Sequence, residues 1–73
     1  MSNYRNPQVH EILTRAEAKG GLGSTSTFNQ VVDVLSKSCN ATNIAAMEQY
    51  LMSLECAKGI SNAGAILRHK SGL

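Results

Sequence analysis

The sequence predicts an all-α fold, a small bundle of three to four short helices with a flexible N-terminal arm and a C-terminal tail. Three observations lead to this prediction. Apolar residues recur at helical spacing in four separate segments. Residues that typically begin or end helices, such as Asn6-Pro7 and Gly20, separate these segments. No stretch between turn signals alternates apolar and polar residues, as a half-buried strand would.

The first helix is expected to run from Pro7 to about Lys19. Asn6 can accept hydrogen bonds from the free amides of the first turn, and Pro7 suits the first helical position because its missing donor is not needed there. Gly20 ends the helix. One face carries apolar residues at helical spacing: Val9, Ile12, Leu13 and Ala16.

A glycine-rich segment, GGLGSTS at residues 20–26, is expected to connect the first and second helices. A phosphate-binding loop would need a preceding strand and a Gly-Lys-Ser/Thr ending, and the segment has neither. The second helix is predicted from Thr27, which forms a capping box with Gln30, to about Ser38. Its apolar face carries Phe28, Val31, Val32 and Leu35.

The third helix is predicted from about Asn43 to Lys58, with Gly59 closing it. It carries a broad apolar stripe and a weaker apolar patch on another side. The stripe consists of Ile44, Met47, Tyr50, Leu51, Leu54 and Ala57, and the patch consists of Ala45, Met52 and Cys56. A helix that is apolar on two sides usually lies in the middle of a bundle. We therefore expect this helix to be the central one.

The last helix is predicted to begin at Ser61, which would cap it, and to end at Arg68. Ala63, Ile66 and Leu67 would face inward. These bounds predict one helical domain over residues 7–68, with a flexible arm at residues 1–6 and a basic tail at residues 69–73.

The composition favours a folded protein of modest charge. The chain has 73 residues, of which 42% are hydrophobic and 16% charged, and its formal net charge is +2. This balance is too apolar for a disordered chain and too weakly basic for a dedicated nucleic-acid-binding protein. No apolar run approaches the roughly 20 residues that span a membrane, and no signal peptide is evident. We expect a cytoplasmic monomer that does not associate with membranes.

No residue pattern indicates catalysis or metal binding. The two histidines and five acidic residues show no nucleophile paired with a base, so no catalytic residue is predicted. His10 lies on the flank of the first helix and is expected to be a surface or interface residue. Cys39 and Cys56 lack metal-ligand spacing and are expected to pack as free thiols. The prediction is a protein that is not an enzyme and has no cofactor or metal.

A helix-turn-helix is the alternative interpretation of the second and third helices. Residues 43–50 would then enter the major groove of DNA. The third helix has no lysine or arginine before Lys58, however, and its acidic residues Glu48 and Glu55 would repel phosphate. The DNA-binding alternative therefore stays open without a basic recognition surface to support it.

The basic residues near the C-terminus allow two interpretations. Arg68, His69 and Lys70 form a cluster that is either a solvated tail or a secondary electrostatic contact with RNA or DNA. In the second case, Arg68 and Lys70 would be the nucleic-acid-binding residues.

The first six residues also allow two interpretations. Tyr4, Arg5 and Asn6 precede the first helix, and Tyr and Arg are residue types that anchor protein interfaces. The arm would dock into a cleft of a partner. Alternatively, Tyr4 packs back on the first helix near Val9 or Leu13 as a hydrophobic staple.

With MSNYRNPQ as the leading arm of a short helical bundle, the chain resembles the small RNA polymerase-binding transcription regulators of lytic Xanthomonas phages. This resemblance implies binding to the N-terminal part of the β′ subunit of host RNA polymerase, near the RNA exit channel and with β as a further neighbour. It also implies displacement of sigma, inhibition of initiation and read-through of intrinsic terminators in the host cytoplasm. Tyr4, Arg5, Asn6 and His10 would be the protein-binding residues.

Overall fold

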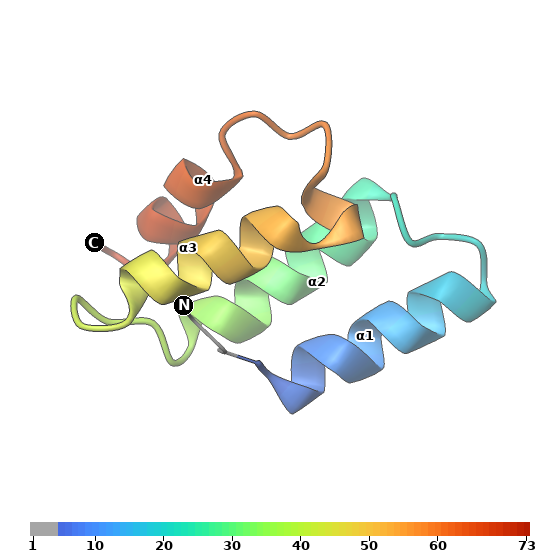
Figure 1. Cartoon of the computed structure of the whole chain (residues 1–73), viewed down its shortest axis with the longest axis horizontal. Helices are drawn as coiled ribbons and strands as arrows, with labels where there is room; N and C mark the ends of the chain where they lie inside the picture. Colours follow the sequence, from blue (N-terminus) through green and yellow to red (C-terminus); the bar gives the residue numbers. More distant parts are fainter. Residues whose placement is uncertain (1–4) are drawn as a thin grey trace.

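The computed structural model describes residues 5–73, and within that range every regular element is helical (Figure 1). The elements are α1 (Pro7–Ala18), α2 (Thr25–Ser36), α3 (Ile44–Ser53), the 3-10 helix η1 (Glu55–Ala57) and α4 (Ala63–Lys70). The predicted all-α fold is therefore confirmed. Tyr4, the first of the predicted binding residues, lies outside the described residues.

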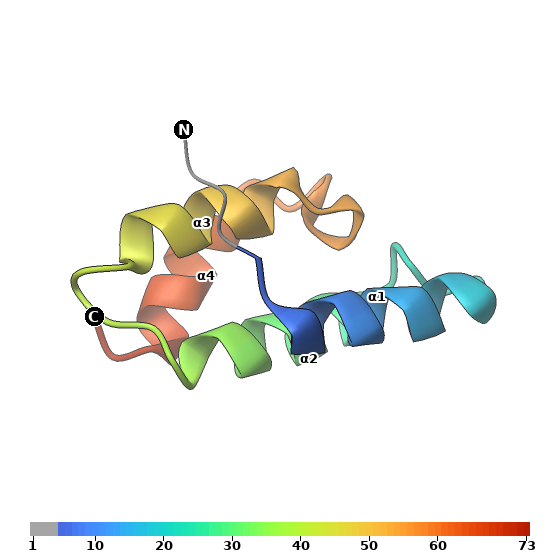
Figure 2. The same ribbon diagram turned by 60° about the horizontal axis from the view of Figure 1, so that its bottom comes forward.

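The centre of the bundle is α2, which contacts α1, α3, η1 and α4. Figures 1 and 2 show α1 running beside α2 in the opposite direction, with α3 across a second layer and α4 packed against both α2 and α3. The core contains Val9, Phe28, Val31, Val32, Leu35, Ile44, Met47, Leu51, Cys56, Ala57, Ala63 and Leu67. Most of these side chains come from α2 and α3, which therefore supply the larger share of the hydrophobic stabilisation.

The prediction that the third helix is central is wrong. The side chains of α3 are buried on one side only, at Ile44, Met47 and Leu51. Two members of the predicted second patch, Ala45 and Met52, face solvent, and Met52 is 53% exposed. α2 takes the central position because its apolar face meets every other element of the bundle.

The first helix follows its sequence signals closely. Asn6 caps α1, and its Oδ1 accepts hydrogen bonds from the backbone amides of Gln8 and Val9 at 2.9 and 3.1 Å. Gly20 adopts a φ of 72°, which only glycine reaches without strain, and its amide donates to the carbonyl of Glu17. Both ends of α1 are therefore defined by hydrogen bonds between residues close in sequence.

The second helix begins two residues earlier than predicted, because Ser24 rather than Thr27 is its cap. The hydroxyl oxygen of Ser24 accepts from the backbone amide of Thr27 at 3.2 Å. Thr27 is itself buried and donates to the carbonyl of Gly21 at 2.8 Å. The connector is correspondingly shorter than the predicted segment of residues 20–26.

The third helix ends at Ser53, five residues before the predicted end at Lys58. Leu54 adopts an extended conformation with a φ of −82° and a ψ of 148°, and η1 follows directly. The chain therefore breaks inside the segment that the sequence pattern predicted to be one helix.

Burial explains this break. A continued helix would place Glu55 and Lys58 on the same face as Leu51, because they follow it by four and seven residues. The break instead turns Cys56 and Ala57 into the core, where they are 2% and 5% exposed. Glu55 and Lys58 then face solvent and form an ion pair at 2.8 Å. The fold buries two apolar side chains and avoids burying two charges.

The last helix begins at Ala63 and continues to Lys70, two residues past the predicted end. Asn62 precedes it without a side-chain capping bond, so the predicted cap at Ser61 is wrong. Gly72, with a φ of 76°, closes the helix in a Schellman arrangement. In this arrangement the amide of Leu73 donates to the carbonyl of Arg68 at 3.0 Å. The predicted tail from residue 69 is therefore the last turn of α4 and its cap.

Candidate protein-binding groove

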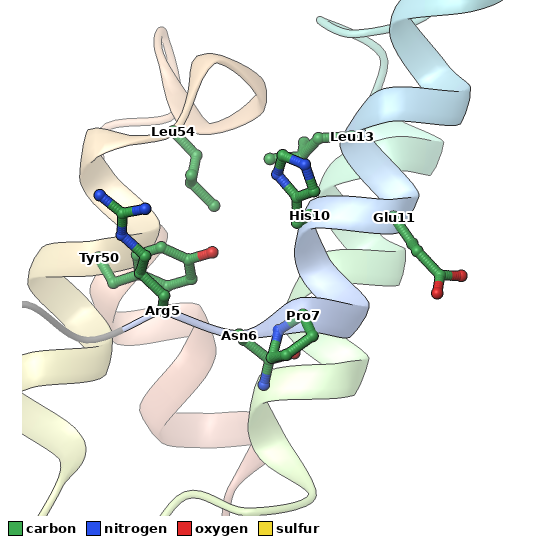
Figure 3. Close-up of a pocket in the computed structure, with 8 residues that line it drawn as sticks. All are labelled: Arg5, Asn6, Pro7, His10, Glu11, Leu13, Tyr50 and Leu54. Atoms are coloured by element: carbon green, nitrogen blue, oxygen red, sulfur yellow. The ribbon is translucent and has the colours of Figure 1, made fainter.

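An open groove of about 710 Å³ lies between the start of α1 and the end of α3 (Figure 3). Its lining consists of Arg5, Asn6, Pro7, His10, Glu11, Leu13, Tyr50 and Leu54. Arg5, Asn6 and His10, three of the four protein-binding residues predicted from the sequence, therefore lie together on one surface. Tyr4, the fourth, directly precedes Arg5 and lies outside the described residues.

The first wall of the groove is the opening turn of α1. Asn6 fixes the start of this helix by capping it, and the amide of His10 donates to the carbonyl of Asn6 at 3.0 Å. This turn places Arg5 just before the helix and His10 and Leu13 on the side that faces α3 (Figure 3). Asn6 thus has a structural role in the cap besides its place on the groove.

The second wall comes from α3 and the residue after it. Tyr50 and Leu54 are half-buried against the core, as is Leu13 on the opposite wall. Figure 3 shows Leu54 extending toward Leu13 and His10, with the ring of Tyr50 behind Arg5. The sequence pattern assigned Tyr50 and Leu54 to a buried stripe. Their position on the groove follows from the separation of α1 and α3 and from the break at Leu54.

The polar and charged side chains around the groove are arranged asymmetrically. Arg5 and His10 are exposed and lie beside the opening. Glu11 is the one carboxylate among the lining residues, and Figure 3 shows it pointing away from the groove. Its Oε1 accepts from Nη2 of Arg15 at 2.8 Å, so its charge is already paired. The groove therefore presents an apolar floor with positive charge at its edge.

The basic residues of α4 are arranged differently, because both predicted nucleic-acid-binding residues are already paired with carboxylates. Arg68 donates from Nε and Nη2 to the two carboxylate oxygens of Glu48 on α3, at 2.9 and 3.1 Å. This hydrogen bonding and the charge of Glu48 raise the pKa of Arg68 above its ordinary value. Lys70 lies 3.8 Å from Asp33, which also pairs with Lys37 at 3.7 Å. A phosphate would have to compete with these carboxylates.

The geometry of α2 and α3 does not favour the DNA-binding alternative. The connection between them is the seven-residue segment 37–43, whereas a helix-turn-helix usually has a turn of three to four residues. The side-chain oxygens of Asn40 and Asn43 accept hydrogen bonds from the amides of Thr42 and Asn40, and Nδ2 of Asn43 donates to the carbonyl of Ser38. These bonds hold the segment. The outward side of α3 carries Ala45, Gln49 and Met52, none of which is charged.

The two cysteines are free thiols, with Cys39 half-buried and Cys56 in the core. Burial raises the pKa of the Cys56 thiol. Within residues 5–73, no three His, Cys, Asp or Glu side chains gather closely enough to hold a metal ion. In the same range, no helix has the length and apolar run needed to cross a membrane.

Comparison with models of protein families, with curated proteins and with solved structures gave no match. Function is therefore inferred from the groove and from the residues that lead into it.

Proposed function

We propose that the protein is a non-enzymatic interaction module that binds bacterial RNA polymerase through the groove between α1 and α3. One observation carries this proposal. Arg5, Asn6 and His10, selected from the sequence as binding residues, converge with three apolar side chains on a single open groove. Arginine and tyrosine, both present in this groove, are enriched among the residues that contribute most to binding at protein interfaces.

We propose RNA polymerase as the partner because the leading arm and the helical layout resemble those of the phage regulators. The N-terminal part of the β′ subunit, near the RNA exit channel, is the proposed docking site. A domain of this size has one physical route to regulation, which is to occupy a surface and so compete with another ligand or shift a conformational equilibrium. Competition with sigma would inhibit initiation, and altered contacts at the exit channel would promote read-through of terminators.

Binding to purified core RNA polymerase tests the proposal directly. We expect the wild-type protein to bind the core enzyme and to lose affinity when Leu54→Asp places a charge on the apolar floor. Met52→Asp is the matched control, because Met52 lies two residues before Leu54, in the last turn of α3, and faces solvent. A transcription assay with sigma would then show reduced initiation for the wild type and the control. Equal binding by both variants would contradict a role for the groove.

The DNA-binding alternative makes a separate prediction. A helix-turn-helix protein with several phosphate contacts loses DNA affinity steeply as the salt concentration rises. We expect no measurable affinity for duplex DNA even at low salt, because the cations of α4 are paired and α3 has none. Specific, salt-sensitive binding of duplex DNA without polymerase would favour the alternative.

A further inference from the structure

The cations of this protein divide sharply into paired and unpaired residues. All seven lysine and arginine residues belong to the part of the chain that the structure describes. Five of them form ion pairs with carboxylates: Arg15, Lys37, Lys58, Arg68 and Lys70. Within residues 5–73, the two without such a pair are Arg5 and Lys19. They lie before and after α1, at opposite ends of the helix.

Arg5 is the unpaired cation that lies beside an apolar surface. It shares the opening of the groove with His10, while Glu11 points away and is held by Arg15 (Figure 3). No carboxylate of the described residues neutralises Arg5. An arginine in this position offers a planar set of donors that matches a carboxylate with two parallel hydrogen bonds.

The floor of the groove, in contrast, favours contact with an apolar side chain. Leu13, Tyr50 and Leu54 are half-buried, and each retains surface that an apolar side chain would cover favourably. An occupant that satisfies both parts must carry an apolar anchor and, next to it, an anionic group.

From this arrangement we propose that the groove binds a segment of a protein partner in which an apolar side chain lies next to an aspartate or glutamate. The apolar side chain packs on Leu13 and Leu54, and the carboxylate pairs with Arg5. This inference rests on the proposed function, since it specifies the chemistry of the site on the polymerase.

A nucleic acid fits the same groove less well. Affinity for a phosphate backbone grows with the number of cations that contact it, and the groove offers one arginine, with His10 beside it. The apolar floor would also remain partly uncovered by a charged backbone. Charge complementarity therefore favours an acidic protein segment.

Charge reversal at the two unpaired cations is the first test. We expect Arg5→Glu to weaken binding to purified core RNA polymerase by about tenfold or more, corresponding to ~1.4 kcal/mol. Lys19→Glu makes the same change in net charge on the far end of α1 and should bind within about twofold of the wild type. An equal loss for both variants would mean that only overall charge matters and would overturn the inference.

The second test identifies the partner's carboxylate. A photo-crosslinking amino acid at position 10, on the edge of the groove, should attach to a polymerase segment that contains an apolar residue next to Asp or Glu. Changing that acidic residue of polymerase to lysine should weaken binding of the wild-type protein and restore binding of the Arg5→Glu variant. A crosslinked segment without a carboxylate, a crosslink to nucleic acid, or a failed restoration would overturn the inference.

A third measurement separates this inference from the proposed function. In NMR titrations, a short peptide of alternating leucine and glutamate should shift the amide signals of His10, Tyr50 and Leu54. A matched peptide of leucine and lysine, and a short single-stranded RNA, should leave them unchanged. If the protein does not bind polymerase but responds in this way, the proposed function fails and the groove chemistry stands. A response to the lysine peptide or to RNA, or none to the acidic peptide, contradicts the groove chemistry itself.

Discussion

The two sides of α3 face different neighbours: one side faces α4 and the other faces the start of α1. On one flank, Glu48 forms its bidentate ion pair with Arg68, and α4 packs closely. On the other flank, Tyr50 and Leu54 border the open groove toward α1. Arg68 is therefore held by a carboxylate of its own fold, whereas Arg5 has no carboxylate partner among residues 5–73. Both residues are arginines, so residue type does not explain why one is paired and the other is not. The difference is the carboxylate of Glu48, which lies on the helix next to Arg68.

The largest expected effect is a loss of stability when a buried residue of α3, lying between its two sides, is truncated. Leu51 is fully buried, and we expect Leu51→Ala to cost about 2–5 kcal/mol of the free energy of unfolding. A single core of this size seldom contributes more than ~3–5 kcal/mol net, so this variant should be largely unfolded. Urea unfolding followed by circular dichroism measures the loss.

The adjacent residue provides the control for this experiment. Met52 is 53% exposed, so Met52→Ala should change stability by less than about 0.5 kcal/mol. Comparable losses at positions 51 and 52 would show that α3 is buried on two sides, which is the arrangement that the sequence pattern suggested.

The second effect concerns the open flank and its partner. Replacing Tyr4 and Arg5 together with alanine should weaken capture of RNA polymerase at least about tenfold, or ~1.4 kcal/mol. The helical circular dichroism spectrum and the melting midpoint should hardly change, because α1 is fixed by the bonds of Asn6 and not by Arg5. A lowered midpoint with intact binding would instead support packing of Tyr4 on α1 as a staple.

The third effect concerns the closed flank, where Gly64 leaves room for Glu48. A Cβ atom at position 64 would lie 2.9 Å from Oε2 of Glu48, so an alanine there must shift the carboxylate that binds Arg68. In the Glu48→Ala background this conflict disappears, and Gly64→Ala should stabilise the protein by up to about 1 kcal/mol through helix propensity. In the wild-type background the gain should be smaller or absent.

A double-mutant cycle on the melting midpoints of the four proteins measures this coupling. Gly23→Ala is the control, because a Cβ atom at Gly23 would meet no atom within 4 Å. Its effect should be the same with and without Glu48. Equal gains from Gly64→Ala in both backgrounds would mean that the close approach to Glu48 has no energetic consequence.

Local signals in the sequence predicted the helices well but not the contacts between them. Asn6, Pro7 and Gly20 fix α1 through bonds within a few residues, and their roles are as predicted. The cap of α2 was misplaced because Ser24 and Thr27 both suit a capping position, and only burial of Thr27 decides between them.

The candidate site could be predicted only in part for the same reason. Arg5 was predicted because arginine often anchors protein interfaces and here precedes the first helix, and His10 because of the resemblance to the phage regulators. Tyr50 and Leu54 were not, because their exposure depends on how far α1 lies from α3. The pairing of Arg68 with Glu48 spans twenty residues of sequence, and no local pattern shows it. Long-range packing therefore decides which charged residues remain available for binding.

The last comparison, which leaves stability and binding unchanged, is between a thiol of η1, just beyond the groove residue Leu54, and a thiol of the loop before α3. Cys56 is buried and its pKa is raised by burial, so near neutral pH it has little reactive thiolate and little access to reagent. Cys39 is half-buried. We expect iodoacetamide to modify Cys39 at least about tenfold faster than Cys56, and raising the pH to accelerate both. Mass spectrometry of tryptic peptides measures the two rates, and unfolding in urea, the control, should make them similar. Equal rates in the native protein would mean that η1 opens readily and that Cys56 is not protected by its burial in the core.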